Sequence, residues 1–215
     1  MRRSMTDSNR RLERSSQFSD FSFGAVTIAS MALILASASP RRQELLRNAG
    51  ISFTVRAANI PEIPLAGEAP EAYATRLATE KAHAVFHQRS NECVLGADTV
   101  VIVDGEILGK PRDEIDAARI LRLLSGKTHE VITGVCLLDS FEDSRYERTL
   151  VSMSALSDEN IRQYIATREP TDKAGAYAIQ GVASRWIHKI EGDYFNVVGL
   201  PVALVYRMLR EHHLI

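Results

Sequence analysis

The feature that most constrains the fold is an apolar run, residues 32–36, that leads through a short polar turn into a helical pattern. The run predicts a buried strand. Ser39 is a favourable N-cap, Pro40 suits the first helical position, and Gly50 is placed to end the helix. The folded part of the chain is therefore predicted to begin with a strand, a tight turn and a helix.

The turn itself carries the groups of an anion site. Ser37 and Ser39 supply hydroxyls, and free N–H groups lie at the positive end of the helix dipole. Arg41 and Arg42 fall in the first helical turn, where a cation is disfavoured by about 0.3–1 kcal/mol. Two guanidinium groups at positions that disfavour a cation indicate an anion-binding role, and their geometry suits phosphate. An ordinary solvated turn, with both arginines in water, is the alternative.

Composition limits the class of protein. The 215 residues are 45% hydrophobic and 25% charged, which is typical of a globular protein with one sizeable domain. A formal net charge of −1 gives no overall attraction to nucleic acid or to an anionic membrane, so an anion site must be local. No apolar run is long enough to span a membrane. Cys93 and Cys136 lie in apolar runs without metal-ligand spacing, which predicts reduced core residues and a cytoplasmic protein.

Residues 1–30 differ from the rest of the chain. They are rich in Ser and Arg and lack sustained periodicity, which predicts a disordered extension. Met31 stands directly before the first strand and favours a misassigned start. A transit peptide is the alternative, against which Asp7, Glu13 and Asp20 count. We therefore predict one folded domain over residues 31–215.

The remaining pattern alternates strands with helices. Strands are predicted over 51–55, 93–103, 106–108, 128–138, 145–155, 186–187 and 194–198, and helices over 71–88, 113–124, 157–164 and 202–210. The apolar periodicity predicts that Ala84, in the helix over 71–88, and Ile115, in the helix over 113–124, face the core. Asp104-Gly105 predicts a hairpin, and hairpins mixed with crossovers predict an α/β fold with a mixed, twisted sheet flanked by helices.

An acid in the middle of an apolar strand is the strongest single candidate for a functional residue. Asp98 lies in the run over 93–103, and burying it without a partner or a metal is costly. The Asp104-Gly105 turn brings Lys110 back level with Thr99, close to Asp98. Glu62 lies in a proline-containing loop over 59–70. Lys81 lies on the helix that follows, where a solvated charged face is the default interpretation.

A second candidate stretch, residues 172–181, combines small residues with Asp172, Lys173 and Gln180. Small residues permit the close approach of a ligand or of another backbone. The Gln180 amide carries a donor and an acceptor, which suits hydrogen bonds to the edge of a nucleobase. His129, at the start of a predicted strand, is more simply a hydrogen-bonding structural residue.

Six stretches, in this order, make the chain resemble the Maf family of nucleoside triphosphate pyrophosphatases: residues 37–42 (SASPRR), 96–99 (GADT), 109–111 (GKP), 125–129 (SGKTH), 172–181 (DKAGAYAIQG) and 196–201 (NVVGLP). The resemblance runs from about Leu33 to Arg210. It implies a Maf/ITPase-like fold that forms a single catalytic unit with a central cleft. It also implies a divalent metal, a homodimer, and cleavage of a nucleoside triphosphate between its α and β phosphates.

The resemblance also implies roles for individual residues. Asp98 corresponds to the group that activates water, and Lys110 with the turn residues Ser37, Ser39, Arg41 and Arg42 corresponds to the phosphate-binding set. Glu62 corresponds to an acid near the metal, although Pro61 stands where family members often have a second acid. Hard oxygen ligands suit Mg²⁺ or Mn²⁺, and no Cys/His set is spaced for zinc.

Substrate preference is implied by the same comparison. Ala-Asp-Thr and Ile-Gln-Gly resemble family members that act on dTTP and UTP, with Arg41, Thr99 and Gln180 at the specificity positions. The group that prefers 7-methyl-GTP typically has Ser-Asp-Gln, and a glutamate in place of Gln180. The sequence thus predicts a hydrolase of dTTP, UTP and modified pyrimidine nucleotides. A nucleotide-binding regulator of cell division is the alternative. A kinase ranks lower because no Gly-x-x-x-x-Gly-Lys-Ser/Thr loop is present.

Overall fold

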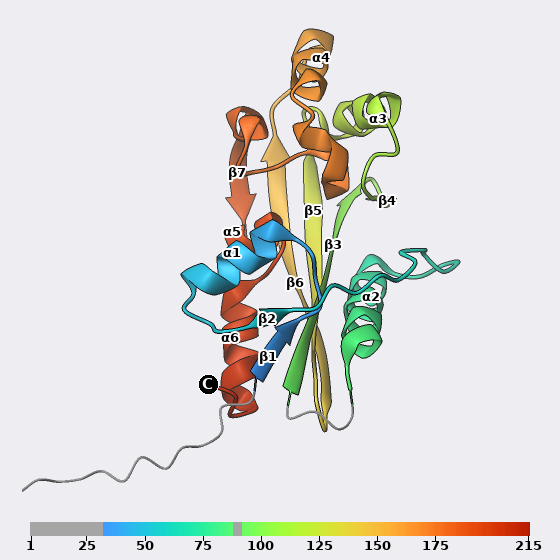
Figure 1. The fold of residues 1–215 in the computed structure, drawn as a ribbon. Coiled ribbons are helices and arrows are strands. Elements are labelled where there is room, and N and C mark those ends of the chain that lie inside the picture. The colour runs from blue at the N-terminus through green and yellow to red at the C-terminus, as the bar shows by residue number, and fades with distance from the viewer. Residues whose placement is uncertain (1–31, 88–91) are drawn as a thin grey trace, which may run out of the picture.

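The computed structural model describes residues 32–87 and 92–215, and the predictions for residues 1–31 lie outside this part of the chain. The described residues form a mixed seven-stranded sheet in the order β2-β1-β3-β5-β6-β7, with β4 paired to β3 (Figure 1). The strands are β1 (Ala32–Leu35), β2 (Thr54–Val55), β3 (Glu92–Val103), β4 (Glu106–Leu108), β5 (Thr128–Leu138), β6 (Glu142–Met153) and β7 (Ile187–Glu191). β1 is parallel to β2 and β3, and the other pairs are antiparallel. The predicted mixed α/β sheet is confirmed.

Helices cover both faces of the sheet. They are α1 (Pro40–Asn48), α2 (Pro70–Val85), α3 (Glu114–Leu124), α4 (Asp158–Ala166), α5 (Tyr194–Val198) and α6 (Val202–Glu211), with 3₁₀ turns at Glu169–Asp172, Ala174–Ala176 and Val182–Trp186. α2 packs on one face, over β3 and β5, and buries two smaller apolar clusters there. The other helices pack on the opposite face and bury the main core. Figure 1 shows α2 to the right of the strands and α1, α5 and α6 to the left.

Two glycines let α2 approach the sheet more closely than side chains would allow. A Cβ atom at Gly96 of β3 would lie 2.0 Å from the Ala78 carbonyl oxygen, and one at Gly134 of β5 would lie 2.3 Å from the Ala74 carbonyl oxygen. The helix backbone therefore touches the strands directly at both points. Side chains alternate along a strand, so Asp98 faces the same side of the sheet as Gly96.

One edge of β3 has a notch between two neighbouring strands. β1 pairs with β3 as far as Leu95, and β4 pairs with it from Val101 onward. Between these points, residues 96–100 have no strand partner on that side among the described residues. β1 is parallel and β4 antiparallel to β3, so both end at the notch. The turn after β1 and the Gly109-Lys110 segment after β4 therefore meet at the stretch that contains Asp98.

Most local predictions agree with the structure. Ser39 caps α1 by accepting from the Arg42 N–H, Pro40 is the first helical residue, and Gly50 has a φ of 69°. The Asp104-Gly105 hairpin, β5, α4 and α6 lie where they were predicted. Both cysteines are buried and free.

Five predictions about secondary structure or helix faces are wrong. Residues 194–198 form α5 rather than a strand, because the Asp193 side chain accepts from the Phe195 N–H and caps a helix. The strand over 51–55 is reduced to the two residues of β2. Ile115 is 82% exposed, because α3 turns Asp116 inward, where it pairs with flanking arginines. Ala84 is also exposed, and α2 ends at Val85 rather than residue 88.

Candidate active site

A cleft of about 840 Å³ opens at the notch in β3. Its walls come from the turn between β1 and α1, the loop over residues 56–69, α2, β3, the segment after β4, and α5. The predicted site residues that line it are Ser37, Ser39, Arg41, Arg42, Glu62, Lys81, Asp98, Thr99, Lys110, Asp172 and Lys173. The cleft thus brings together residues that are separated by more than one hundred positions in the sequence.

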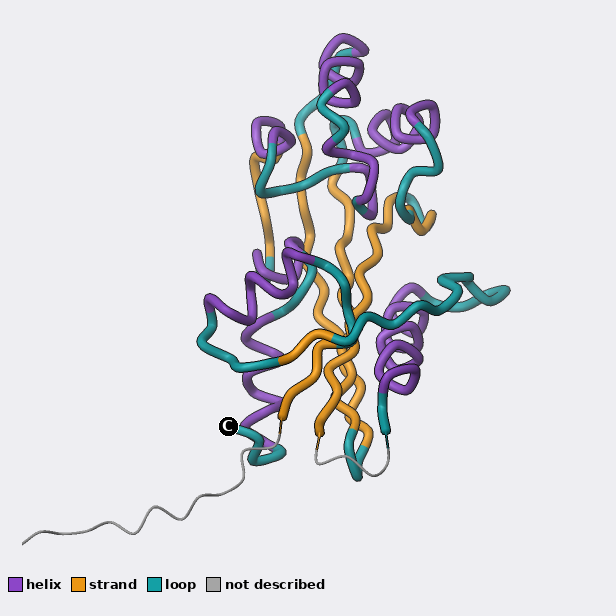
Figure 2. The backbone as a smooth tube through the Cα atoms, in the orientation of Figure 1, coloured by secondary structure: helices purple, strands orange, loops and turns teal. Residues whose placement is uncertain are grey.

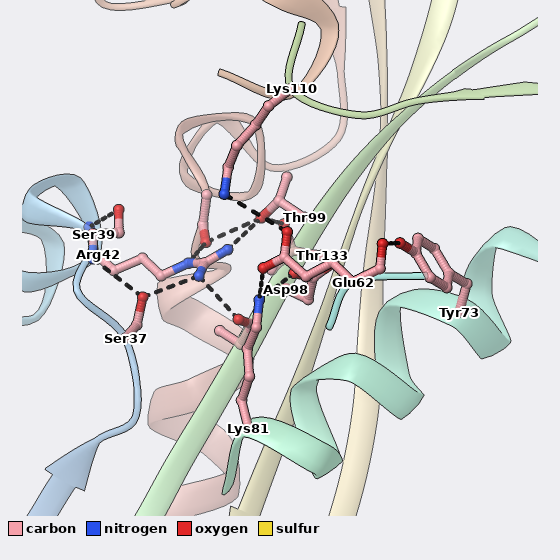
Figure 3. A network of polar contacts seen from close by, with 12 residues as sticks. Ser37, Ser39, Arg42, Glu62, Tyr73, Lys81, Asp98, Thr99, Lys110 and Thr133 are labelled. Carbon is pink, nitrogen blue, oxygen red and sulfur yellow. Dashed lines mark hydrogen bonds and ion pairs between the residues drawn. The ribbon is translucent and has the colours of Figure 1, made fainter. Parts of the chain in front are cut away.

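The centre of the cleft is a chain of alternating charges (Figure 3). Lys81 Nζ lies 2.6 Å from Asp98 Oδ1 and 2.7 Å from Glu62 Oε1. Lys110 Nζ lies 3.6 Å from the other oxygen of Glu62. The default expectation of a solvated Lys81 is wrong, since this residue is only 8% exposed. The direct contact of α2 with Gly96 and its neighbour strand brings the lysine to Asp98.

The two carboxylates differ in their affinity for a proton. Burial raises the pKa of Asp98 above its ordinary value, against the opposing charges of Lys81 and Arg42. Burial also acts to raise the pKa of Glu62, but the hydrogen bond and charge of Lys81, together with Lys110, hold it below its ordinary value. A raised pKa makes Asp98 the better proton acceptor. Glu62, with its lowered pKa, keeps its negative charge to lower pH than an ordinary glutamate does.

The two adjacent arginines have different surroundings. Arg42 is buried, and its guanidinium donates to Gly199 O at 2.8 Å, Ala97 O at 2.9 Å, Ser37 Oγ at 3.1 Å and Thr99 Oγ1 at 3.0 Å. Four of its five N–H donors are therefore engaged by the protein. Arg41 lines the cleft and makes no hydrogen bond or ion pair with the described residues. Its donors are available to a ligand.

The hydroxyl of Thr99 belongs to the wall of the cleft. Its Oγ1 accepts from Arg42 and lies 2.9 Å from Thr133 Oγ1 of β5. Thr133 in turn donates to the Asn196 carbonyl oxygen of α5 at 3.2 Å. This network ties α1, β3, β5 and α5 together behind the charged centre. Figure 3 shows Arg42 reaching from α1 toward Thr99.

The loop that carries Glu62 is fastened to α2. It leaves β2, passes the centre of the sheet and projects beyond α2 (Figure 2). Tyr73 donates to the Glu62 carbonyl oxygen at 3.1 Å. Arg76 forms a two-point ion pair with Glu68, at 2.6 and 2.7 Å, and donates to the Ile63 carbonyl oxygen at 3.1 Å. Tyr73, Glu68 and Arg76 support the Glu62 loop but were not predicted as parts of the site, because contacts between a loop and a helix leave no local signal in the sequence.

The sequence matches one known protein family over most of its length. The family model described as "Maf-like protein" matches residues 32–212. The chain belongs to the Maf-like family. The family resemblance inferred from the sequence is thereby confirmed.

Curated members of the family are closely similar over most of the chain. A dTTP/UTP pyrophosphatase of Koribacter versatilis is 59% identical over 181 residues, which cover 84% of this chain and 94% of the relative. A dTTP/UTP pyrophosphatase of Geobacter sulfurreducens is 51% identical over 181 residues, covering 83% and 95%. Among solved structures, a nucleoside-triphosphatase (dITP/XTP pyrophosphatase) of Mycobacterium abscessus is 18% identical, with a TM-score of 0.38 and coverage of 59% and 76%. That structural likeness is too weak to carry an argument.

The cleft of this Maf-like family member fits a divalent metal through two acids. Glu62 and Asp98 converge on one point, since both contact the same Lys81 nitrogen. The described residues contain no group of three or more Asp, Glu, His or Cys side chains arranged for a metal. Mg²⁺ is commonly held by one or two carboxylates together with substrate phosphates and water. The donor set thus suits Mg²⁺ or Mn²⁺ with a phosphate ligand.

The segment over 172–181 lies only partly at the cleft. Asp172 and Lys173 line the cleft and pair with each other. Gln180 is exposed and is not part of the lining. Buried Tyr177 also lines the cleft, and its hydroxyl lies 2.7 Å from His129 Nε2, which agrees with a structural role for His129. No helix in the described part of the chain is both long and apolar enough to cross a membrane.

Proposed function

We propose that this protein hydrolyses dTTP, UTP and modified pyrimidine nucleoside triphosphates to the monophosphate and pyrophosphate. The observation that carries the proposal is the convergence of Asp98, Glu62, Lys81 and Lys110 in one cleft beside the turn that presents Arg41. The activity named for the two relatives at 51% and 59% identity, dTTP/UTP pyrophosphatase, supports the same reaction and the choice of pyrimidine substrates.

The phosphates are bound by cations and hydroxyls at the cleft wall. Arg41 and Lys110 supply positive groups at the cleft, and the Ser39 hydroxyl and the Arg41 N–H supply donors to the same oxygens. The Arg42 and Gln43 N–H groups of α1 already bond Ser39. Arg42 acts beside Arg41 and Lys110 mainly as a support, because four of its donors are held by the protein. Asp172 and Lys173 line the same cleft.

Proton transfer is assigned to Asp98. Its carboxylate lies in the buried part of the cleft, and burial raises its pKa toward the range useful for a general base. Asp98 therefore accepts the proton of the attacking water, and its Oδ1 lies 2.6 Å from Lys81 Nζ. Glu62 and Asp98 would hold the divalent metal. When bound, that metal supplies charge neutralisation on the phosphate oxygens.

Base selection is assigned to Arg41, Thr99 and Gln180. Arg41 has free donors at the cleft. Thr99 acts by forming part of the cleft wall, because its hydroxyl is hydrogen-bonded to Arg42 and Thr133. Gln180 acts only if the exposed end of its segment moves inward when the nucleotide binds. The homodimer and the cytoplasmic location implied by the family remain parts of this proposal.

A nucleotide panel tests the function. Purified protein is incubated with Mg²⁺ or Mn²⁺ and each common nucleoside triphosphate, and pyrophosphate release is measured. We expect release from dTTP and UTP. We also expect Asp98→Asn to lose at least about a hundredfold in kcat, the lower range for removing a general base, while nucleotide binding stays measurable. A preference for purines would refute the substrate assignment, and near-normal turnover of Asp98→Asn would refute the base. Rescue of a division defect by Asp98→Asn would favour the non-enzymatic alternative.

A further inference from the structure

Lys81 makes the same two contacts that a metal ion would need. Its ammonium lies 2.7 Å from Glu62 Oε1 and 2.6 Å from Asp98 Oδ1, so it bridges the two acids (Figure 3). The side chain enters from α2 and is only 8% exposed, so little water competes for these bonds. A divalent cation that binds Glu62 and Asp98 must therefore share both carboxylates with an ammonium that already contacts one oxygen of each.

The charges around this point do not favour a lone cation. Two carboxylates, Glu62 and Asp98, face three positive groups. Lys81 touches both acids, Lys110 Nζ lies 3.6 Å from Glu62 Oε2, and the charge of Arg42 acts on both acids. The net charge of these five groups is therefore +1. Because cation affinity depends on the net anionic charge of the ligands, this cluster binds Mg²⁺ or Mn²⁺ weakly without further anions.

We propose that Lys81 competes with the divalent metal for Glu62 and Asp98, so that the metal binds together with the nucleoside triphosphate and not before it. The inference rests on the proposed function for the identity of the metal ligands and of the substrate. The triphosphate adds negative charge at the cleft and engages Lys110 and Arg41. Its arrival reverses the sign of the local charge and offers phosphate oxygens to the metal.

This competition has a reciprocal consequence. If the nucleotide raises the affinity for the metal by some factor, then the metal raises the affinity for the nucleotide by the same factor. Lys81 contributes to that factor by lowering the affinity for the metal alone. Replacement of Lys81 with methionine keeps most of its length and removes its charge. The variant should therefore bind metal on its own, and the gain from nucleotide should shrink.

The test measures Mn²⁺ binding by electron paramagnetic resonance or calorimetry, which needs no turnover. Mn²⁺ is titrated into the full-length protein alone and in the presence of an α,β-imido analogue of dUTP. For the unaltered protein we expect affinity at least tenfold tighter with the analogue. For Lys81→Met we expect affinity for Mn²⁺ alone to rise at least tenfold. Lys127→Met is the matched control, because Lys127 also contacts an acid, Asp104, at 2.6 Å, but its side chain is 41% exposed and lies outside the cleft lining.

Each outcome bears on the proposal separately from the enzymatic function. Equal Mn²⁺ affinity with and without the analogue in the unaltered protein would overturn the competition, even if Lys81→Met failed to fold. A folded Lys81→Met that binds Mn²⁺ no tighter than Lys127→Met would overturn it too. Pyrophosphate release with either result leaves the function standing and the competition refuted. The expected binding pattern without release of pyrophosphate from any nucleotide leaves the competition standing and the function refuted.

Discussion

The two neighbouring arginines of α1 give a matched test of how the cleft is built. Arg42 donates to carbonyl oxygens of β3 and of the residue after α5, whereas Arg41 makes no hydrogen bond with the described residues. We predict that Arg42→Lys destabilises the fold and that Arg41→Lys impairs only nucleotide binding. Both changes keep the positive charge, so they isolate the planar guanidinium from charge alone.

The size of the Arg42 effect follows from its contacts. A lysine at position 42 presents its donors from one nitrogen and cannot span the carbonyl oxygens of Ala97 and Gly199 and the two hydroxyls. Each buried acceptor left without a donor costs about 1–3 kcal/mol, so two of them cost roughly 2–6 kcal/mol. In a chain of this size that loss lowers the melting temperature by about 4–24 °C.

The Arg41→Lys effect should appear in nucleotide binding, and hence in kcat/KM, but not in stability. A half-exposed side chain without protein partners changes stability by about 0.5 kcal/mol or less. Loss of a charge-assisted hydrogen bond of about 1.5–3 kcal/mol to a phosphate lowers kcat/KM for dTTP roughly 10- to 100-fold. Differential scanning fluorimetry and steady-state kinetics on both variants separate the two effects. An Arg42→Lys protein that melts within about 2 °C of the unaltered protein and loses nucleotide affinity would refute the support role of Arg42.

Two further predictions concern the supports of the cleft. Glu68→Gln breaks the ion pair with Arg76 that holds the Glu62 loop. It should raise several-fold the Mn²⁺ concentration needed for half-maximal activity and leave the melting temperature nearly unchanged. Glu159→Gln, which removes one partner of an exposed ion pair on α4, is the control. Burial lowers the pKa of His129 to about 4, below that of the unfolded chain, so the unfolded state binds the extra proton between pH 6.5 and 4. Stability should fall by up to about 3 kcal/mol across that window, and denaturant titrations of His129→Gln should show a smaller fall. An equal fall in both proteins would contradict this.

Local signals in the sequence predicted the parts of the site that depend on neighbouring residues. The N-cap at Ser39, the proline after it and the hairpin at Asp104-Gly105 each act within a few residues. They were enough to predict a phosphate turn after β1 and a return of the chain near Asp98. The Lys110 contact with Glu62 joins that return to a loop more than forty residues earlier.

Predictions failed where tertiary contacts opposed the local pattern. The aromatic and β-branched residues over 194–198 favour a strand, but Asp193 caps a helix and Asn196 donates to Val131 O and Thr149 Oγ1 across the sheet. Ile115, by contrast, is exposed for a local reason, because the adjacent Asp116 pairs with Arg112 and Arg119, which lie within about one helical turn of it. The partners of Asn196 lie on β5 and β6, which the periodicity of residues 194–198 cannot reveal.

Lys81 is positioned by the contact of α2 with β3 and β5, and the small residues that make this contact can be identified in the sequence. On α2, Lys81 follows Ala74 and Ala78 at helical spacing and therefore shares their face. On the sheet, Gly96 lies two residues before Asp98, and Gly134 is paired directly with Asp98 in the register of β3 and β5. These glycines and alanines let the helix backbone touch the strands beside the acid. A lysine on that helix face must then meet Asp98, which makes the glycine of the Gly-Ala-Asp-Thr stretch a determinant of the charged centre.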